Sequence, residues 1–272
     1  MRNFVIILIL IVCILCFFSA NDGFLQYDQK EYGVFLSVDN QKMEELKDYK
    51  TVVIDAAYFN KEDIDRLKQA GHTVYTYLNI GSLENFRPYY KEYSKYTLGK
   101  YKNWEEEQWI DVSQKQWQKL ICGLADEYEE KGVDGFFIDN CDVYYLYKQD
   151  KIYKGLVDIL SQLKDSGLDV IINGGDSFIS KYYGENKNLN KILTGINQET
   201  VFSSIDFEKK RLGYSSNEEK EYFISYLNKM NQAGAAIYLL EYTSDKKLEK
   251  QIQKYCTKKG WKYYISDSVE LD

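Results

Sequence analysis

Carboxylate and amide side chains follow a series of short apolar segments in this chain. The clearest case is the run Gly135–Ile138, which is followed at once by Asp139 and then, within one turn, by Asp142. Such a carboxylate can act as a nucleophile, a general acid or base, or a metal ligand. Asp is also a favoured N-cap residue, so Asp139 could equally begin the next helix.

The same arrangement recurs along the chain. Seven polar residues stand at or just past the end of an apolar segment: Asp55, Asn79, Asp139, Asn173, Glu199, Glu241 and Asp267. One such residue is a common turn former, but seven in equivalent positions are hard to explain by turns alone. If the segments are parallel strands of one barrel, all seven side chains gather at the face where barrel enzymes carry out their chemistry.

Eight apolar segments alternate with amphipathic stretches and provide the strands of such a barrel. The expected strands are residues 33–38, 51–55, 73–79, 135–139, 170–173, 193–199, 235–241 and 261–265. The alternation of strands and helices predicts a (β/α)8 TIM barrel, a single α/β domain over residues 33–272. The stretch 80–109 is rich in Tyr and charged residues, and we expect it to be a long loop.

The first 20 residues have the composition of a targeting segment. Arg2 precedes the uncharged apolar run Phe4–Phe18, and small residues follow up to Ala20. Phe18 would occupy the −3 position of a cleavage site after Ala20, so a cleaved signal peptide and an uncleaved signal anchor both remain open. Residues 21–32 would form a short linker. We expect the barrel to be extracellular, either secreted or tethered to the outer face of the cytoplasmic membrane through this segment alone.

Composition excludes several classes of function. The net charge is −7 and no basic patch stands out, so we expect no nucleic-acid partner. Beyond the targeting segment, three widely spaced cysteines and His72 provide neither a disulfide framework nor a zinc site. His72 lies in a predicted helix-to-strand turn, where we expect it at the surface. The sequence therefore predicts no metal, no cofactor and a monomeric protein.

A ring of carboxylates and amides suits hydrolysis of a glycosidic bond. This reaction needs two carboxyl groups across the scissile bond, one protonated and one ionised. The chain has no phosphate-binding glycine-rich loop and no recognisable motif that pairs a Ser or Cys nucleophile with histidine. Its 26 Tyr residues offer flat faces for stacking on sugar rings, although a compositional bias of the source would give the same count.

Three blocks of sequence contain recognisable motifs: Tyr77–Pro88, Asp134–Asp142 and Asn197–Glu199. They contain a Gly-Ser-x-Glu-x-x-Arg-Pro motif, an Asp-Gly-x-x-x-Asp-Asn-x-Asp motif and an Asn-x-Glu motif, in that order. These blocks resemble glycoside hydrolase family 114, the endo-α-1,4-polygalactosaminidase-like barrels. The chain departs from the family pattern at Tyr89, where an acidic residue often stands, and at Cys141, where the family has an apolar residue.

The resemblance implies a glycosidase that cleaves an extracellular amino-sugar polysaccharide, of the galactosaminogalactan or polygalactosamine type. Asp139 would be the nucleophile and Glu199 the general acid/base. The implied substrate-binding residues are Asp55, Asn79, Glu84, Arg87, Asn140, Asp142, Asn173, Glu241 and Asp267. Among these, Glu84 and Arg87 could form an ion pair. The alternative is a non-catalytic barrel that binds polysaccharide or cell wall at the same mouth.

Overall fold

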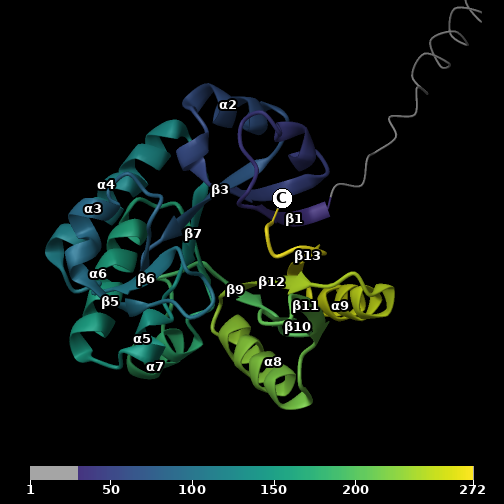
Figure 1. Cartoon of the computed structure of the whole chain (residues 1–272). Helices are drawn as coiled ribbons and strands as arrows, with labels where there is room; N and C mark the ends of the chain where they lie inside the picture. Colours follow the sequence, from purple (N-terminus) through teal and green to yellow (C-terminus); the bar gives the residue numbers. More distant parts are fainter. Residues whose placement is uncertain (1–29, 272) are drawn as a thin grey trace, which may run out of the picture.

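Eight parallel strands form the central sheet of the computed structural model, which describes residues 30–271. In hydrogen-bonded order they are β1 (Lys30–Phe35), β2 (Tyr49–Ile54), β3 (Thr73–Asn79), β7 (Gly135–Asp139), β8 (Asp169–Asn173), β9 (Gly195–Glu199), β12 (Ala236–Tyr242) and β13 (Lys262–Ser266). β13 packs beside β1, so the sheet curls into a nearly closed barrel (Figure 1). The predicted (β/α)8 TIM barrel is confirmed.

The N-terminal expectations fall largely outside this description. The predicted signal peptide or anchor, residues 1–20, lies outside the described residues, as does most of the predicted linker. β1 begins at Lys30, slightly before the expected start of the barrel at residue 33. Within residues 30–271, no helix is both long enough and apolar enough to cross a membrane.

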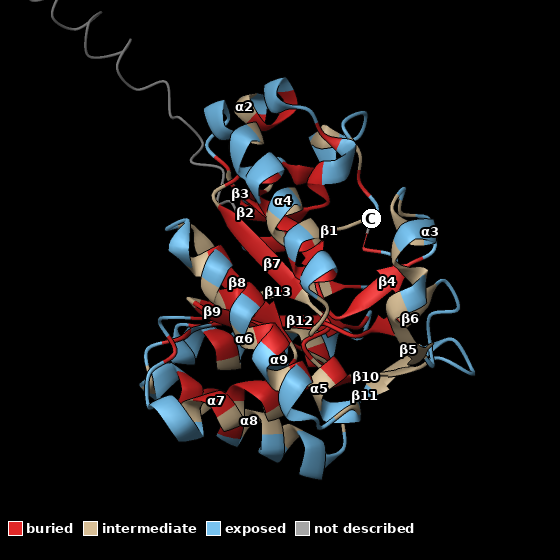
Figure 2. Ribbon diagram, turned by 90° about the vertical axis from the view of Figure 1, so that its left-hand side faces the viewer, coloured by how far each residue is buried: buried red, intermediate tan, exposed pale blue. Residues whose placement is uncertain are grey.

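Helices between the strands cover the outside of the barrel, with their exposed faces toward solvent (Figure 2). The longer ones are α2 (Lys61–Gln69), α4 (Lys115–Lys131), α6 (Asp150–Asp165), α7 (Asp176–Asn186), α8 (Asn217–Gln232) and α9 (Lys246–Lys259). In α6 the buried residues Ile152, Leu156, Ile159 and Leu163 recur at helical spacing, so one face packs inward. Short helical turns are η1 (Met43–Leu46), η2 (Ala56–Tyr58), α3 (Tyr90–Tyr93), η3 (Ser94–Tyr96) and α5 (Val143–Leu146).

Burial of the strands places the polar residues that follow them. Phe136, Phe137 and Ile138 in β7 are buried, as expected for a parallel strand that is covered on both faces. Asp139 is the first polar residue after this run and stands at the carboxyl end of the strand. It does not cap the next helix, because its side chain bonds to other residues of the barrel mouth.

The long loop expected over residues 80–109 is wrong. This stretch contains a three-stranded antiparallel sheet of β4 (Ser82–Glu84), β5 (Thr97–Lys100) and β6 (Glu107–Ile110). A second unpredicted unit is the hairpin of β10 (Ser203–Asp206) and β11 (Arg211–Tyr214). These strands have three or four residues, and each contains one charged residue beside its apolar ones. Pairing with a neighbour stabilises them, and they lack the hydrophobic periodicity by which strands are predicted.

The surface position expected for His72 is also wrong. The residue is only 7% exposed, and its Nδ1 lies 2.6 Å from the carbonyl oxygen of Tyr49. Tyr49 begins β2 and Thr73 begins β3, so the turn before β3 packs at the amino end of the barrel. His72 therefore satisfies a buried carbonyl at the end of the barrel opposite Asp139.

Gly81 allows the turn after β3 to lie against the backbone after β7. A methyl group on this residue would sit 1.8 Å from the carbonyl oxygen of Asn140. The turn cannot easily retreat, because the Trp117 indole donates to the Ile80 carbonyl over 2.9 Å and the Ile110 amide donates to the Gly81 carbonyl over 3.1 Å. The close approach explains the glycine in this sequence block.

We therefore expect Gly81→Ala to lower the free energy of unfolding by roughly 2 kcal/mol or more, because the added methyl group meets backbone. Gly123→Ala in α4 is the matched control, since no atom lies within 4 Å of its added methyl group. That substitution should stabilise the helix by about 0.5–1 kcal/mol. Urea denaturation measures both changes, and equal stability of the two variants would contradict this account.

Candidate active site

A pocket of about 800 Å³ opens at the carboxyl ends of the barrel strands. Eight of the eleven predicted site residues line it: Asp55, Glu84, Arg87, Asp139, Asn140, Asp142, Asn173 and Glu199. The other three, Asn79, Glu241 and Asp267, lie outside its lining. Four of the seven residues predicted from strand ends therefore line the pocket, and the other four of these eight lining residues come from the family resemblance.

One amide group joins the side chains of Asp139 and Glu199. Asn173 Nδ2 donates to Asp139 Oδ1 over 2.9 Å and to Glu199 Oε1 over 2.7 Å. When each of these oxygens accepts one of the two amide protons, the oxygens lie about 5 Å apart. The three residues end the consecutive strands β7, β8 and β9, so the parallel register of the barrel brings them together.

The barrel interior determines which way the Asn173 amide faces. Asn197 Nδ2 donates to Asn173 Oδ1 over 2.7 Å, and Asn197 Oδ1 accepts a bond of 3.2 Å from the Tyr32 hydroxyl. Asn197 and Tyr32 are fully buried. Because Asn173 Oδ1 already accepts from inside the barrel, its Nδ2 faces the pocket and the two carboxyl groups.

The residues that follow the two carboxyl groups both turn sharply. Asn140 after Asp139 has φ of 67°, and Thr200 after Glu199 has φ of 55°. This left-handed conformation costs roughly 1 kcal/mol or more for a residue with a Cβ atom, and it is most unusual for a β-branched residue such as Thr200. Local strain of this kind persists only where the surrounding contacts hold it in place.

Glu241 holds the turn after β9 and does not line the pocket, contrary to its predicted role in binding substrate. Its side chain is fully buried and accepts hydrogen bonds from the backbone amides of Phe202, over 3.0 Å, and Ser203, over 2.8 Å. The Ser203 hydroxyl donates to it over 2.6 Å and accepts from the Tyr242 amide over 2.9 Å. Tyr242 in turn donates to Glu199 Oε2 over 2.9 Å. Glu241 is therefore a positioning residue.

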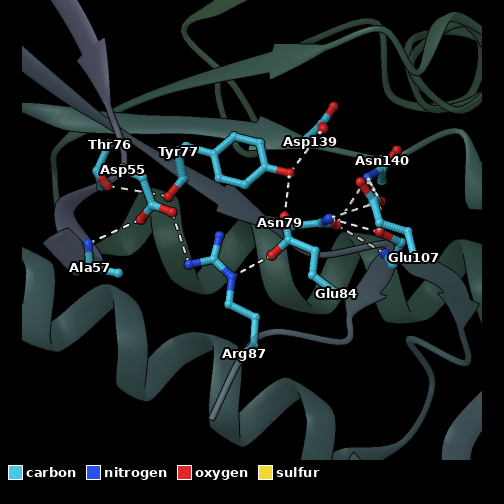
Figure 3. A network of polar contacts seen from close by, with 11 residues as sticks. Asp55, Ala57, Thr76, Tyr77, Asn79, Glu84, Arg87, Glu107, Asp139 and Asn140 are labelled. Carbon is cyan, nitrogen blue, oxygen red and sulfur yellow. Dashed lines mark hydrogen bonds and ion pairs between the residues drawn. The ribbon is translucent and has the colours of Figure 1, made fainter. Parts of the chain in front are cut away.

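Asn79 and Asp267 do not line the pocket, and the reasons differ. Asn79 is covered by the turn after β3, where its Nδ2 donates to Ser82 Oγ over 2.7 Å and its Oδ1 accepts from Asn140 Nδ2 over 3.1 Å. Ser82 Oγ donates to Glu107 over 2.5 Å, and Figure 3 shows Asn79, Asn140 and Glu107 close together. Asp267 follows the last residue of β13, is exposed and lies outside the pocket lining.

Arg87 lies between two carboxylates at one side of the site (Figure 3). Its guanidinium forms ion pairs with Glu84 and, over 2.8 Å, with Asp55. Burial alone would lower the pKa of Arg87, but these carboxylates outweigh it and hold the pKa above its usual range. The Tyr77 hydroxyl lies 3.2 Å from both Glu84 Oε1 and Asp139 Oδ2, so it connects this ion pair to the centre of the site.

Enclosure by protein raises the pKa values of the carboxyl groups in the pocket. Burial and the neighbouring charge of Glu199 raise the pKa of Asp139 to about 8. Burial also raises the pKa of Glu199 and of Glu107, and it raises the pKa of Asp142 to about 6. Asp139 and Glu199 keep some contact with solvent in the pocket, so they can exchange protons with it. Burial and mutual repulsion therefore oppose simultaneous ionisation of Asp139 and Glu199.

A known protein family matches nearly the whole barrel. The family model for glycoside-hydrolase family GH114 matches residues 20–269. The chain belongs to family GH114. This GH114 protein is accordingly a glycoside hydrolase, and the resemblance of its three sequence blocks is confirmed.

Similar proteins include relatives of unknown activity and solved glycosidase domains. An uncharacterized protein of Methanocaldococcus jannaschii is 21% identical, over 83% of this chain and 70% of its own length. The glycoside hydrolase domain of PelA from Pseudomonas aeruginosa superposes with a TM-score of 0.76 at 18% identity, covering 89% of this chain and 96% of that domain. Ega3 of Aspergillus fumigatus, solved with galactosamine, gives 0.68 at 15% identity, covering 90% and 92%. These structures share the barrel fold of this GH114 enzyme.

Four further residues of this GH114 site were missed in the sequence. Tyr77, Tyr101, Glu107 and Tyr242 line the pocket and bond to its polar residues. Tyr77 precedes Asn79 by two positions in β3, so strand alternation places both on one face and could have indicated it. Tyr101 and Glu107 carry no such signal, because they lie in the stretch expected to be a loop.

We expect ionisation of the second acid of the Asp139–Glu199 pair to lower the stability of the GH114 barrel as pH rises. The pKa of about 8 at Asp139 describes loss of the last proton from this pair and lies above the ordinary value of 3.8, so the folded state binds more protons between these values and stability falls with rising pH. Asp139→Asn leaves a single acid in the pair and removes the repulsion that opposes its ionisation. The unfolding free energy of the variant, relative to wild type, should increase by roughly 1 kcal/mol or more from pH 5 to pH 8. Parallel stability curves in urea would contradict the raised pKa.

Proposed function

We propose that this GH114 enzyme hydrolyses an amino-sugar polysaccharide by a double displacement, with Asp139 as nucleophile and Glu199 as general acid/base. The bridge that Asn173 makes between the two carboxyl groups carries this proposal, because it sets their separation. Retaining glycosidases hold their two carboxyl groups about 5–5.5 Å apart, whereas inverting enzymes leave about 6.5–9.5 Å for a water molecule. The separation of about 5 Å favours the retaining arrangement.

The hydrogen bonds of the two carboxyl groups support placing the proton of the pair on Glu199. Asp139 accepts from the Asn173 amide and from the backbone amide of Asn140, and the Tyr77 hydroxyl is within reach. Glu199 accepts from the same amide of Asn173 and from a tyrosine hydroxyl. The additional backbone donor favours ionised Asp139. Part of the rise in the pKa of Asp139 is repulsion by ionised Glu199, and this repulsion disappears once Glu199 carries the proton.

The two steps then follow from these positions. Asp139 attacks the anomeric carbon and forms a covalent glycosyl–Asp139 ester. The bond from that carbon to the glycosidic oxygen breaks at the same time, and the oxygen keeps the bonding electrons and leaves as a hydroxyl group with the proton of Glu199. Ionised Glu199 next takes a proton from water, whose oxygen displaces Asp139 from the anomeric carbon. Asp139 is released as a carboxylate and Glu199 regains its proton, so the enzyme is restored.

Charge in the pocket supports an amino sugar as the substrate. The acidic lining residues are Asp55, Glu84, Glu106, Glu107, Asp139, Asp142, Asp176, Glu199 and Glu270. Arg87 is the one basic residue among the pocket-lining residues in the described part of the chain, and two carboxylates already bind it. A protonated sugar amine would be attracted to this surface, whereas a uronic acid would be repelled.

The same proposal places the enzyme outside the cytoplasm. Phe4–Phe18 is an uncharged apolar run preceded by Arg2, as in segments that carry a protein across a membrane. An extracellular polysaccharide is accessible only from that side. Release and tethering to the outer face of the membrane are both consistent with this segment.

Removing either carboxyl group should abolish hydrolysis. We expect Asp139→Asn and Glu199→Gln each to lower kcat by about 10²–10⁴-fold on de-N-acetylated α-1,4-polygalactosamine, because each loses one of the two roles. Asp267→Asn is the matched control, since this exposed carboxylate lies outside the pocket lining. Near-normal turnover by either catalytic variant would contradict the assignment. Binding without cleavage by the wild type would favour the non-catalytic alternative.

The configuration of the first product reports the arrangement of the pair. We expect the reducing end released from an α-linked polymer to be the α-anomer at first, because two displacements restore the original configuration. Proton NMR recorded within the first minutes of cleavage, before mutarotation, measures it. Initial appearance of the β-anomer would require an inverting mechanism with a wider separation.

Substrate charge should matter in a salt-dependent way. We expect kcat/KM to be higher for de-N-acetylated than for fully N-acetylated polygalactosamine, and this preference should weaken between about 50 mM and 500 mM NaCl as the charges are screened. The neutral polymer serves as the control for general effects of salt. Equal rates on both polymers at low salt would argue against recognition of a cationic sugar.

A further inference from the structure

Two hairpins from distant parts of the chain meet over the pocket. The connection between β5 and β6 carries Trp104, and the connection between β10 and β11 carries Phe207. Their ring centroids lie 5.9 Å apart with the planes inclined at 75°. Figure 2 shows both hairpins at the same end of the barrel. Because one hairpin follows β3 and the other follows β9, this contact spans the part of the mouth formed by β7 and β8.

The two rings remain open to solvent although they touch. Trp104 is 38% exposed and Phe207 is 37% exposed, and both line the pocket. An edge-to-face contact leaves much of each ring face uncovered, and it is weak compared with burial of a whole ring. Exposed aromatic faces beside a strongly polar pocket are suited to bind the apolar face of a sugar ring.

Hydrogen bonds with buried side chains hold the bases of the two hairpins. Ser203 at the start of β10 is bound to buried Glu241, and Glu107 at the start of β6 is bound to Ser82. The tips that carry Trp104 and Phe207 can therefore exchange their mutual contact for a ligand without moving the residues around Asp139.

Other exposed aromatic rings lie near Asp55, across the mouth from Phe207. Tyr58 and Phe86 also line the pocket, and Phe86 packs 5.2 Å from the Arg87 guanidinium beside Asp55. Asp55 follows β2, which is second in the strand order, whereas Phe207 follows β9, which is sixth. In a barrel of eight strands these positions face each other across the mouth. The carboxyl groups of Asp139 and Glu199, which Asn173 joins, then lie between aromatic side chains on two sides.

We propose that Trp104 and Phe207 form a sugar-binding site that stacks on a pyranose ring of the polysaccharide chain remote from the bond being cleaved. This inference rests on the proposed function, because it concerns how the same pocket holds a long chain. Contacts on both sides of the mouth favour binding of an internal segment of the polymer over binding of its end.

The kinetic test compares long and short substrates. Trp104→Ala and Phe207→Ala should each raise KM for de-N-acetylated α-1,4-polygalactosamine by about 10-fold and leave kcat unchanged, because the lost contact is equal in the ground and transition states. If the rings bind a sugar remote from the bond being cleaved, a galactosamine trisaccharide at the reacting centre should not extend to them, and its kinetic constants should stay within about 2-fold. Trp104→Phe should retain most of the affinity, since it keeps an aromatic face.

Tyr214→Ala is the matched control, because Tyr214 is exposed on β11 of the same hairpin and lies outside the pocket lining. It should not change KM for the polymer. Unchanged KM in the Trp104 and Phe207 variants would overturn the inference while leaving the proposed hydrolysis in place. An equal loss on polymer and trisaccharide would also overturn it, because the rings would then support only the reacting centre.

Binding without turnover gives a direct measurement. Trp109, Trp117 and Trp261 are buried, so acrylamide quenching of fluorescence reports chiefly on Trp104. In the Asp139→Asn variant, saturating polygalactosamine should reduce this quenching, and Trp104→Phe in the same background should abolish the protection. If calorimetry shows binding but quenching is unchanged, the ring site is wrong and the catalytic proposal stands. If wild type neither binds nor cleaves the polymer, both proposals fail.

Discussion

The position of one amide group underlies the geometry of this site. Asn173 holds Asp139 and Glu199 at a fixed separation, and it can do so only with its nitrogen facing the pocket. That orientation is set from below by Asn197, which is itself held by Tyr32. The polar chain is buried in the barrel, where an unsatisfied donor or acceptor would be costly, so reversing the Asn173 amide would place nitrogen against nitrogen and oxygen against carboxylate. The pairing of the hydrophobic strands brings these residues close together, and this chain of hydrogen bonds orients their side chains for reaction.

The site also concentrates features that oppose folding. Carboxyl groups are enclosed with too few cations to neutralise them, and the residues after Asp139 and Glu199 adopt strained backbone conformations. Local interactions compensate both features. Arg87 forms ion pairs with two of the carboxylates, and Glu241 accepts hydrogen bonds from backbone amides that follow Thr200. The clustered carboxyl groups and the sharp turns after β7 and β9 therefore lower the stability of the fold, and an unreactive barrel would need neither.

Prediction from the sequence succeeded for residues that end a strand, because the carboxyl ends of the parallel strands meet at the mouth of the barrel. Asp139, Asn173 and Glu199 are each the last residue of a strand and each line the pocket. The strand holding Glu241 was expected to end there, but β12 continues to Tyr242, and side chains alternate along a strand. Tyr242 therefore faces the pocket and Glu241 faces the other way. An error of one residue in a strand end reverses the inferred role, and sequence patterns rarely locate ends more accurately than that. The sheet of β4, β5 and β6 depends on pairing between distant residues, which no local pattern could reveal.

The way the two hairpins are attached has a consequence for how such enzymes diversify. Buried hydrogen bonds around Ser82, Ser203 and Glu241 hold the bases of the hairpins. Trp104 and Phe207 stand in the connections between the strands and take no part in those bonds. Mutations can accumulate at the tips without disturbing the reacting carboxyl groups, so descendants of one ancestral barrel could adapt to different glycan chains while inheriting the same catalytic machinery unchanged.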